Sequence, residues 1–206
     1  MSLKALILEG GAMRSVHSAG ALVALNELGF SHDYFDIVFG ASAGACNASY
    51  FLANQTNIFW DLWTKTIVSK EFLNFNNIFT SKPILDVDFA VFEVMTKRHK
   101  LDLDKILASK SKFYVVATNC ETGKPEYLLN NKAESFFDIL KASSAIPILY
   151  NKTIHLNNTE YMDGSITDSI PIKKAIELGA KEIYLILTRH ENYKKNKSIS
   201  ENITSS

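Results

Sequence analysis

The sequence predicts an α/β domain in which helices cover both sides of a mostly parallel central sheet, a three-layer α/β/α arrangement. Two strand–turn–helix units follow one another at the start of the chain, and both turns are rich in glycine. A third apolar run of strand length, residues 113–118, lies in the middle of the chain. Alternation of apolar strands with helical stretches indicates crossover connections and therefore a parallel sheet.

The first two units show this pattern most clearly. Residues 3–8 form a continuous apolar run that stops at Glu9, as a buried parallel strand does before a turn. Apolar residues then recur at three- and four-residue steps over 16–28, which predicts a helix that Gly29 can end. A second apolar run, 34–39, leads into another glycine turn and a helix of small residues. Both strands should therefore lie in one sheet.

The later part of the chain gives shorter signals. Residues 153–162 predict a hairpin, with Asn157-Asn158 as its two-residue turn, and residues 182–188 predict a last strand. Helix-like patterns cover 87–95 and 103–107. These elements complete the expected α/β domain.

Length and composition limit the classes of protein to consider. At 206 residues the chain has the size of one domain, which we assign to residues 1–189; we expect the polar segment 190–206 to be a disordered tail. Basic and acidic residues are equal at 22 each, so no overall field favours nucleic acid. No apolar stretch approaches the ~20 residues that span a bilayer, and the first apolar run is too short for a signal peptide. We therefore expect a cytoplasmic protein that binds no nucleic acid.

The sequence contains no motif for a metal site or a disulfide framework. Cys46 and Cys120 belong to no CxxC pair, and we expect both to be free thiols. No histidine has a partner at a metal-ligand spacing, so we expect neither a metal nor a cofactor. The histidines are His17, His32, His99, His155 and His190.

Residues 40–44 read Gly-Ala-Ser-Ala-Gly and match the pattern G-x-S-x-G. In this pattern the serine lies in a strained strand-to-helix turn that lifts its hydroxyl out of the sheet, and Gly40 and Gly44 leave room for neighbouring backbone. The apolar strand before the turn and the helix after it are the context that the motif requires. Ser42 is therefore the candidate nucleophile, and a tight turn with a helix-capping serine is the alternative.

Residues 9–14, Glu-Gly-Gly-Ala-Met-Arg, follow the first strand and open a helix. Backbone N–H groups in such a turn can point at a common centre, where they would bind an anion. A nucleotide phosphate loop is the competing interpretation, but neither GxxxxGK[ST] nor GxGxxG fits these residues. The loop is therefore a candidate oxyanion hole.

Asp163 stands at the end of the predicted hairpin, directly before Gly164. The neighbouring glycine lets another stretch of backbone approach closely. An Asp-Gly pair by itself is most often only a turn, so its position alone does not identify a catalytic base.

Taken together, these segments resemble the patatin-like phospholipases, particularly their cytoplasmic bacterial members. The likeness covers about residues 3–189, nearly the whole chain. Several ordered motifs over that span are far more specific than any one alone. The segments that carry it are 9–14, 40–44, 117–125, 142–147 and 163–171.

The resemblance implies a patatin-like fold and hydrolysis of acyl esters, usually in lipids, by a serine–aspartate dyad. By the match of motifs, Ser42 is the nucleophile and Asp163 is the base that takes its proton. The backbone N–H groups of Gly10, Gly11 and Ala12 would hold the oxyanion, and Arg14 would add positive charge. The expected partner is a lipid or other hydrophobic acyl ester, with peripheral contact to a membrane.

Three positions depart from the family pattern. Ala12, Ser15 and Ser165 stand where the family usually has glycine. If the position of Ala12 requires positive φ, the oxyanion loop is strained. Two alternatives therefore stay open: a weakly catalytic lipid- or partner-binding member of the same fold, and an acyltransferase that uses the same dyad.

Other segments have a less specific interpretation. The rival hydroxyls of Ser143, Ser144 and Ser165 do not lie in a G-x-S-x-G turn. We assign the aromatic stretch 59–79 to core packing rather than to an acyl cleft, and the basic run 97–100 to a solvated turn rather than to headgroup binding.

Overall fold

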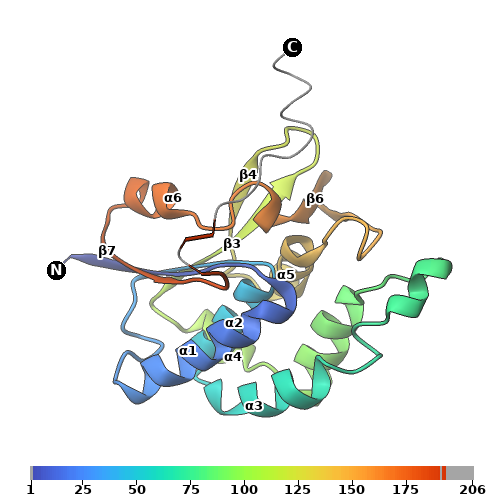
Figure 1. Ribbon diagram of the computed structural model, residues 1–206. Coiled ribbons are helices and arrows are strands. Elements are labelled where there is room, and N and C mark those ends of the chain that lie inside the picture. The colour runs from blue at the N-terminus through green and yellow to red at the C-terminus, as the bar shows by residue number, and fades with distance from the viewer. Residues whose placement is uncertain (1, 191, 194–206) are drawn as a thin grey trace.

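A seven-stranded sheet lies at the centre of the computed structural model, which describes residues 2–190, 192 and 193 (Figure 1). Its strands are β1 (Leu3–Leu8), β2 (Ile37–Ala41), β3 (Lys112–Asn119), β4 (Pro125–Leu129), β5 (Ile154–Leu156), β6 (Thr159–Asp163) and β7 (Ala180–Ile186). The order is β5-β6-β3-β2-β1-β7, and β4 also pairs with β3. The pairings from β7 to β3 are parallel, whereas those of β4, β5 and β6 are antiparallel.

Helices cover both faces of the sheet. The α-helices are α1 (Val16–Glu27), α2 (Ala43–Leu52), α3 (Phe59–Asp61), α4 (Leu103–Leu107), α5 (Phe136–Ser144) and α6 (Ile172–Glu177). Because side chains alternate along a strand, Leu6 and Leu8 enter a large core with α1, α2 and α5, whereas Ile7 enters a smaller core with α6. Figure 1 shows α6 on one side of the sheet and α1, α2 and α5 on the other. The predicted three-layer α/β/α fold is confirmed, with α6 in the thinner layer.

Between α2 and β3 the chain forms short helical segments, and two of them are wider than an α-helix. The segments η3 (Leu62–Thr66) and η5 (Phe89–Arg98) have the wide π-helical hydrogen-bonding pattern. Leu73 pairs with Leu85 in an isolated bridge, so residues 74–84 form a loop between two joined ends. The remaining single turns are η1 (Ala12–Ser15), η2 (Thr56–Ile58), η4 (Phe75–Phe79), η6 (Ala133–Ser135) and η7 (Gly164–Ile166).

Most of the predicted elements are confirmed. Gly29 follows α1 with φ 86°, as a left-handed helix stop should. The hairpin of β5 and β6 turns at Asn157 and Asn158, whose φ angles of 47° and 67° suit a type I′ turn. The second strand begins at Ile37, later than predicted, and the last begins at Ala180, earlier than predicted. The sequence pattern did not predict β4, α5 or α6.

Two further expectations concern the ends of the chain and the membrane. The tail predicted over 190–206 lies outside the described residues, except for His190, Asn192 and Tyr193. None of the helices in the described part of the chain is long and apolar enough to cross a bilayer.

Candidate active site

β3 brings together two strand ends that are far apart in the sequence. Ala41, the last residue of β2, lies beside Val116, and Asp163, the last residue of β6, lies beside Ala117. β4 pairs with the same part of β3 and therefore occupies its opposite edge. β2 and β6 thus meet end to end along one edge of β3, and Ser42 follows directly at this junction.

Ser42 occupies the strained turn that its motif predicts. Its φ of 53° and ψ of −133° are unusual for a residue with a side chain, and its exposed fraction is only 3%. A Cβ on Gly40 would lie 2.4 Å from Ala45 Cα, and a Cβ on Gly44 would lie 2.7 Å from Leu8 O. Both glycines are therefore required by close backbone contacts.

A buried serine from α5 holds this turn in place. The Ser42 N–H donates to Ser143 Oγ at 2.9 Å, and the Ser143 hydroxyl donates to Val116 O at 2.5 Å. Ser143 therefore ties the turn to β3. The sequence singled out Ser143 only as a rival nucleophile, and nothing local in the sequence shows this contact.

Asp163 is buried beside Ser42 with one carboxylate oxygen free. Oδ1 accepts the Ser165 N–H at 2.8 Å, whereas Oδ2 has no hydrogen-bond partner among the described residues. Burial raises the pKa of Asp163, and the nearby hydroxyls of Ser42 and Ser165 oppose this rise. A Cβ on Gly164 would lie 2.1 Å from Val116 O, so glycine is needed for β6 to reach β3 here.

The glycine loop after β1 packs directly against the Ser42 turn. A Cβ on Gly10 would lie 3.2 Å from Ser42 Cβ and 2.9 Å from Ala41 O. Within the described residues, the N–H groups of Gly10 and Gly11 donate no intramolecular hydrogen bond. Ala12 has a φ of 47°, which is the strained condition anticipated for this position.

The base of this loop is anchored to the end of β7. The buried Glu9 carboxylate accepts hydrogen bonds from the Thr188 N–H at 2.6 Å and the Thr188 hydroxyl at 3.0 Å. A Cβ on Gly11 would lie 2.6 Å from Thr188 Oγ1. Thr188 therefore shapes the loop, although no motif in the sequence drew attention to it.

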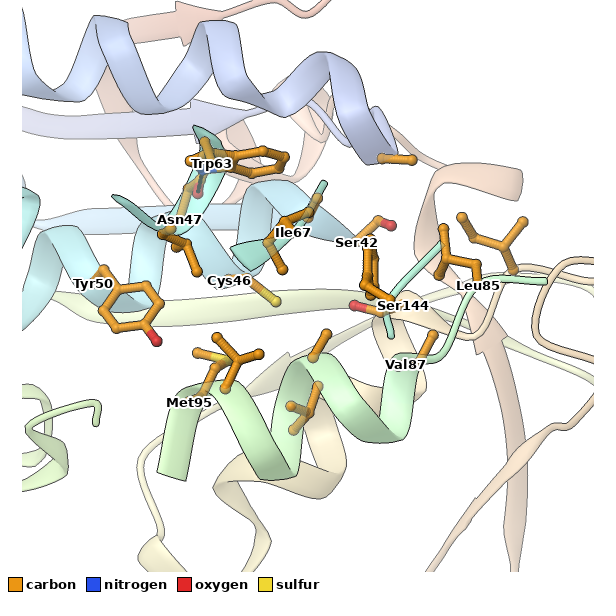
Figure 2. Close-up of a pocket in the computed structure, with 18 residues that line it drawn as sticks. Ser42, Cys46, Asn47, Tyr50, Trp63, Ile67, Leu85, Val87, Met95 and Ser144 are labelled. Atoms are coloured by element: carbon orange, nitrogen blue, oxygen red, sulfur yellow. Dashed lines mark hydrogen bonds between the residues drawn. The ribbon is translucent and has the colours of Figure 1, made fainter. Parts of the chain in front are cut away.

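Two cavities meet at Ser42. The first is an open cleft of ≈ 370 Å³, lined by Arg14 and Asp163 and by the apolar side chains of Ile146 and Ile166. The second is an apolar slot of ≈ 70 Å³ between α2 and η5 (Figure 2). Ser42, Ala12 and Ile146 line both. The open cleft collects the residues that the sequence singled out from three segments: Gly10, Gly11, Ala12, Arg14, Ser42, Asp163 and Ser165.

The histidines lie away from the two cavities, and the cysteines are not activated to react. None of the five histidines lines either cavity. Burial, with the nearby Asp163 charge, raises the pKa of the Cys46 thiol to about 11, so this thiol in the slot stays neutral. Cys46 and Cys120 are free, as expected. Among the described residues, no cluster of three or more histidine, cysteine or acidic side chains is placed to hold a metal ion.

The structure can be compared with the expectations for the aromatic stretch 59–79 and the basic run 97–100. Within residues 59–79, buried side chains such as Trp63 and Phe72 pack in the core and also line the apolar slot. Core packing and cleft lining were treated as alternatives, and here the same residues do both. The basic run 97–100 is partly neutralised, because Lys97 pairs with Glu93 and Arg98 pairs with Glu71.

The fold and the motifs together define the class of protein. The family model for patatin-like phospholipases matches residues 6–176, so the chain belongs to this family. Among proteins with known sequences, the uncharacterized protein YjjU of Escherichia coli strain K12 is 33% identical over 187 residues, which cover 89% of this chain and 51% of YjjU.

A solved structure shares the fold. VipD from Legionella pneumophila aligns with a TM-score of 0.56 and 18% identity, over 83% of this chain and 47% of VipD. At this identity the likeness concerns the fold alone. The chain spans about half the length of both relatives.

Proposed function

We propose that the protein is a serine acyl hydrolase that cleaves lipids or other hydrophobic esters, with Ser42 as nucleophile and Asp163 as base. The observation that carries this proposal is the position of Ser42. It stands in a strained turn, beside a buried carboxylate, where an open cleft meets a narrow apolar slot. A nucleophile at such a junction can attack a carbonyl that has an alkyl chain on one side and a larger group on the other.

Asp163 is suited to take the proton of Ser42. Its Oδ2 has no partner within the part of the chain that the structure describes, and its raised pKa makes the ionised carboxylate a better base than an exposed aspartate. The proton passes from Ser42 Oγ to Asp163 as Oγ bonds to the carbonyl carbon, and then to the departing alkoxide. Water deprotonated by the same carboxylate hydrolyses the acyl-enzyme and returns Ser42 to its starting state.

The glycine loop supplies the positive potential for the oxyanion. Among the described residues, the N–H groups of Gly10 and Gly11 have no hydrogen-bond partner, and both residues line the cleft that contains Ser42, with Ala12 next in the loop. Each such donor lowers the barrier to acyl transfer because it meets negative charge that develops only in the transition state. Arg14 lines the same cleft and adds a cation beside the loop.

Peripheral contact with a lipid surface is a further part of the proposal. Phe75, Ile78 and Phe79 in the loop 74–84 have exposed fractions of 69%, 65% and 91%. Residues 72–85 contain Lys82 but no acidic residue, so this tip suits an anionic or neutral bilayer. The residues at its two ends, Phe72 and Leu85, line the apolar slot. A bilayer at this tip would present lipid close to the slot.

The surface contact has its own test. Phe75→Glu with Phe79→Glu should strongly reduce sedimentation with phosphatidylglycerol vesicles and leave hydrolysis of a soluble short-chain ester unchanged. Trp60→Glu is a matched control, because Trp60 is equally exposed but lies on α3, away from this loop. Equal sedimentation of the double variant and the wild type would show that the tip does not contact the bilayer.

A fluorophosphonate probe tests the catalytic proposal. The probe should label Ser42 and abolish hydrolysis of p-nitrophenyl esters, and Ser42→Ala should lose at least about a thousandfold in turnover with an unchanged melting temperature. Labelling of Ser143, Ser144 or Ser165 instead would contradict the assignment. A folded protein that turns over no ester and takes no label would favour the alternative, a binding member of the fold.

Acyl transfer needs a separate measurement, because it uses the same residues. Adding an alcohol acceptor should leave free fatty acid as the main product of a hydrolase, whereas a transferase should form mostly the new ester. Two free thiols agree with the cytoplasmic location that we propose for the protein.

A further inference from the structure

The apolar slot has two parallel walls that start beside Ser42. From α2, the lining residues are Cys46, Asn47 and Tyr50, one face of the helix that Ser42 begins. From η5 and the residues before it, the opposite wall runs from Val87 to Met95. Figure 2 shows Ser42 and Val87 at one end of the slot and Tyr50 and Met95 at the other. The slot therefore runs from Ser42 toward Tyr50 and Met95, which lie at its far end.

Tyr50 forms that end and is firmly held. Its side chain is 1% exposed, and its hydroxyl donates to the His99 carbonyl at 2.7 Å. Its ring packs edge-to-face on Phe59 at a centroid distance of 6.2 Å. With its hydroxyl bonded away, Tyr50 presents an apolar ring to the slot.

The other large polar side chains along the slot are also satisfied elsewhere. Asn47 Nδ2 donates to Ser15 O at 2.8 Å and to Ser18 Oγ at 3.0 Å, and its Oδ1 accepts from Trp63 Nε1 at 3.1 Å. Neither Asn47 nor Trp63 needs a polar partner inside the slot. The hydroxyl of Ser144 has no partner among the described residues, but Ser144 lies beside Ser42, at the end where the carbonyl of an ester would be (Figure 2). The occupant that fits beyond Ser144 is therefore an unbranched alkyl chain.

The dimensions limit how long this chain can be. Ser42 and Tyr50 are eight residues apart on one helix, so the slot is about 12 Å long at ~1.5 Å per residue. An extended chain advances roughly 1.2 Å per bond, because three backbone bonds span at most ~3.3–3.6 Å. About ten bonds therefore fit. The slot's volume of ≈ 70 Å³ is several times the roughly 10–15 Å³ that a single water needs, so the slot has room for a chain of several carbons.

From this geometry we propose that the protein prefers medium-chain acyl groups, of about six to ten carbons, and that Tyr50 sets the upper limit. Longer chains would meet the Tyr50 ring while their carbonyl is still short of Ser42. The inference rests on the proposed function, since it places the acyl group of that reaction in the slot. It adds a specificity-determining residue that touches the end of the substrate.

The test is the chain-length profile of kcat/KM with p-nitrophenyl butyrate, octanoate, dodecanoate and palmitate. The wild type should be fastest near octanoate. Tyr50→Ala should raise the dodecanoate-to-octanoate ratio at least about tenfold, because the extra methylenes then find apolar space. Met95→Ala opens the same end with a smaller loss of packing, and should shift the ratio in the same direction even if Tyr50→Ala does not fold.

Matched variants separate this effect from general loss of stability. Tyr114→Ala removes a tyrosine that stacks on Phe39 in the core near α6, and it should leave the profile unchanged. Tyr50→Phe keeps the ring and should also keep the profile. A wild type that prefers palmitate, or a Met95→Ala profile identical to the wild type, would overturn the inference and leave the hydrolase proposal standing.

Binding to an inactive variant distinguishes failure of the inference from failure of the proposed function. In Ser42→Ala, calorimetry should show octanoate binding more tightly than palmitate, and this order should reverse when Tyr50→Ala is added. If no ester is hydrolysed by the wild type, the hydrolase proposal fails, and the calorimetric order alone decides whether Tyr50 limits the slot.

Discussion

The turns that follow the neighbouring parallel strands β1 and β2 are both strained, but they differ in what the strained residue contributes. Each holds one non-glycine residue in the left-handed region: Ala12 after β1, with φ 47°, and Ser42 after β2, with φ 53°. Such a conformation costs on the order of 1–3 kcal/mol per residue. Ser42 carries a hydroxyl that points into the reaction site that we propose, whereas the methyl group of Ala12 carries no chemistry.

The two turns also differ in how they are held. Gly40, Gly44 and the hydrogen bond from Ser143 constrain the Ser42 turn from several sides. The Ala12 loop is anchored at its base through Glu9 and Thr188, but the N–H groups of Gly10 and Gly11 have no partner among the described residues. In the Ser42 turn, the strained residue carries the side chain that the proposed reaction requires. In the Ala12 loop, the proposed reaction requires the backbone N–H groups and not the side chain of the strained residue. Substitutions in both turns can test this distinction.

The largest effect should come from the partner of the Ser42 side chain. Asp163→Asn should lower turnover by about a thousandfold or more, as far as Ser42→Ala, because an amide cannot take the serine's proton. The double variant should be scarcely worse than either single one, since the two residues act as a unit. In the wild type, activity should rise with pH as Asp163 ionises, with a midpoint above the 3.8 of an ordinary aspartate.

Histidine variants are the control for this prediction. An ordinary serine hydrolase uses histidine as its base, but none of the five histidines lines either cavity. Each histidine-to-glutamine variant should therefore keep activity within a few-fold. If one of them silences the enzyme while Asp163→Asn stays active, the dyad is wrong.

Asp163→Asn should also change stability in a direction set by the pKa. Burial raises the pKa of Asp163, so the folded state binds this proton more tightly than the unfolded chain. The stability that protonated Asp163 contributes to the folded state is fully present below pH 3.8 and is lost as the pH rises through the pKa of the folded protein. The asparagine variant avoids the buried charge and should melt at a higher temperature near neutral pH, with the difference shrinking in acid. A lower melting temperature near pH 7 would contradict this direction.

The glycine loop should show the next largest effect. Gly11→Pro removes a backbone N–H from the cleft and also moves the loop, because Gly11 has a φ of −173° that proline cannot adopt and a Cβ there would meet Thr188. Turnover should fall at least about a hundredfold. Gly20→Ala is a control, because a Cβ there meets no atom within 4 Å. Unchanged turnover in a folded Gly11→Pro protein would place the oxyanion donors elsewhere.

A smaller loss should follow when the Ser42 turn loses its support. Ser143→Ala leaves the Ser42 N–H and Val116 O without their buried partner, which costs about 1–3 kcal/mol. We expect fluorophosphonate to label Ser42 about tenfold more slowly, as a loss of roughly 1.4 kcal/mol in positioning would produce. Ser49→Ala is the matched control: Ser49 is equally buried, but it bonds only to Ala45 O within α2. Equal labelling rates for the two variants would limit Ser143 to a structural role.

The sequence predicts the two turns well because their signals are local. A G-x-S-x-G turn between an apolar strand and a small-residue helix requires only neighbouring residues, and the structure has Ser42 in that conformation. The pairing of Ser42 with Asp163 is different in kind, because it depends on β2 and β6 meeting along β3. Only the family resemblance, and no spacing, linked these two residues in advance.

The parts that the sequence did not predict depend on tertiary contacts. Ser143 and Thr188 act through hydrogen bonds to residues more than a hundred positions away. The slot is formed by α2 and by the wide helix η5, whose apolar residues look like ordinary core positions in the sequence. Whether a buried side chain faces packing or a cavity is decided by the facing element, which periodicity does not show.

The smallest effect should come from relieving the strain that has no chemical role. Ala12→Gly keeps the backbone N–H and removes the Cβ that makes φ 47° unfavourable. Relief of that strain is worth about 1–2 kcal/mol, and the greater freedom of glycine in the unfolded chain takes back about 0.4–1 kcal/mol. The free energy of unfolding should therefore rise by up to about 1.6 kcal/mol in urea titrations, and turnover should stay equal or increase a few-fold. Ser42→Gly should show a similar gain in stability together with complete loss of activity, because only there does the side chain react. A stability loss in Ala12→Gly, with activity falling as well, would mean that the methyl group is needed where it borders both cavities, and the distinction between the two turns would fail.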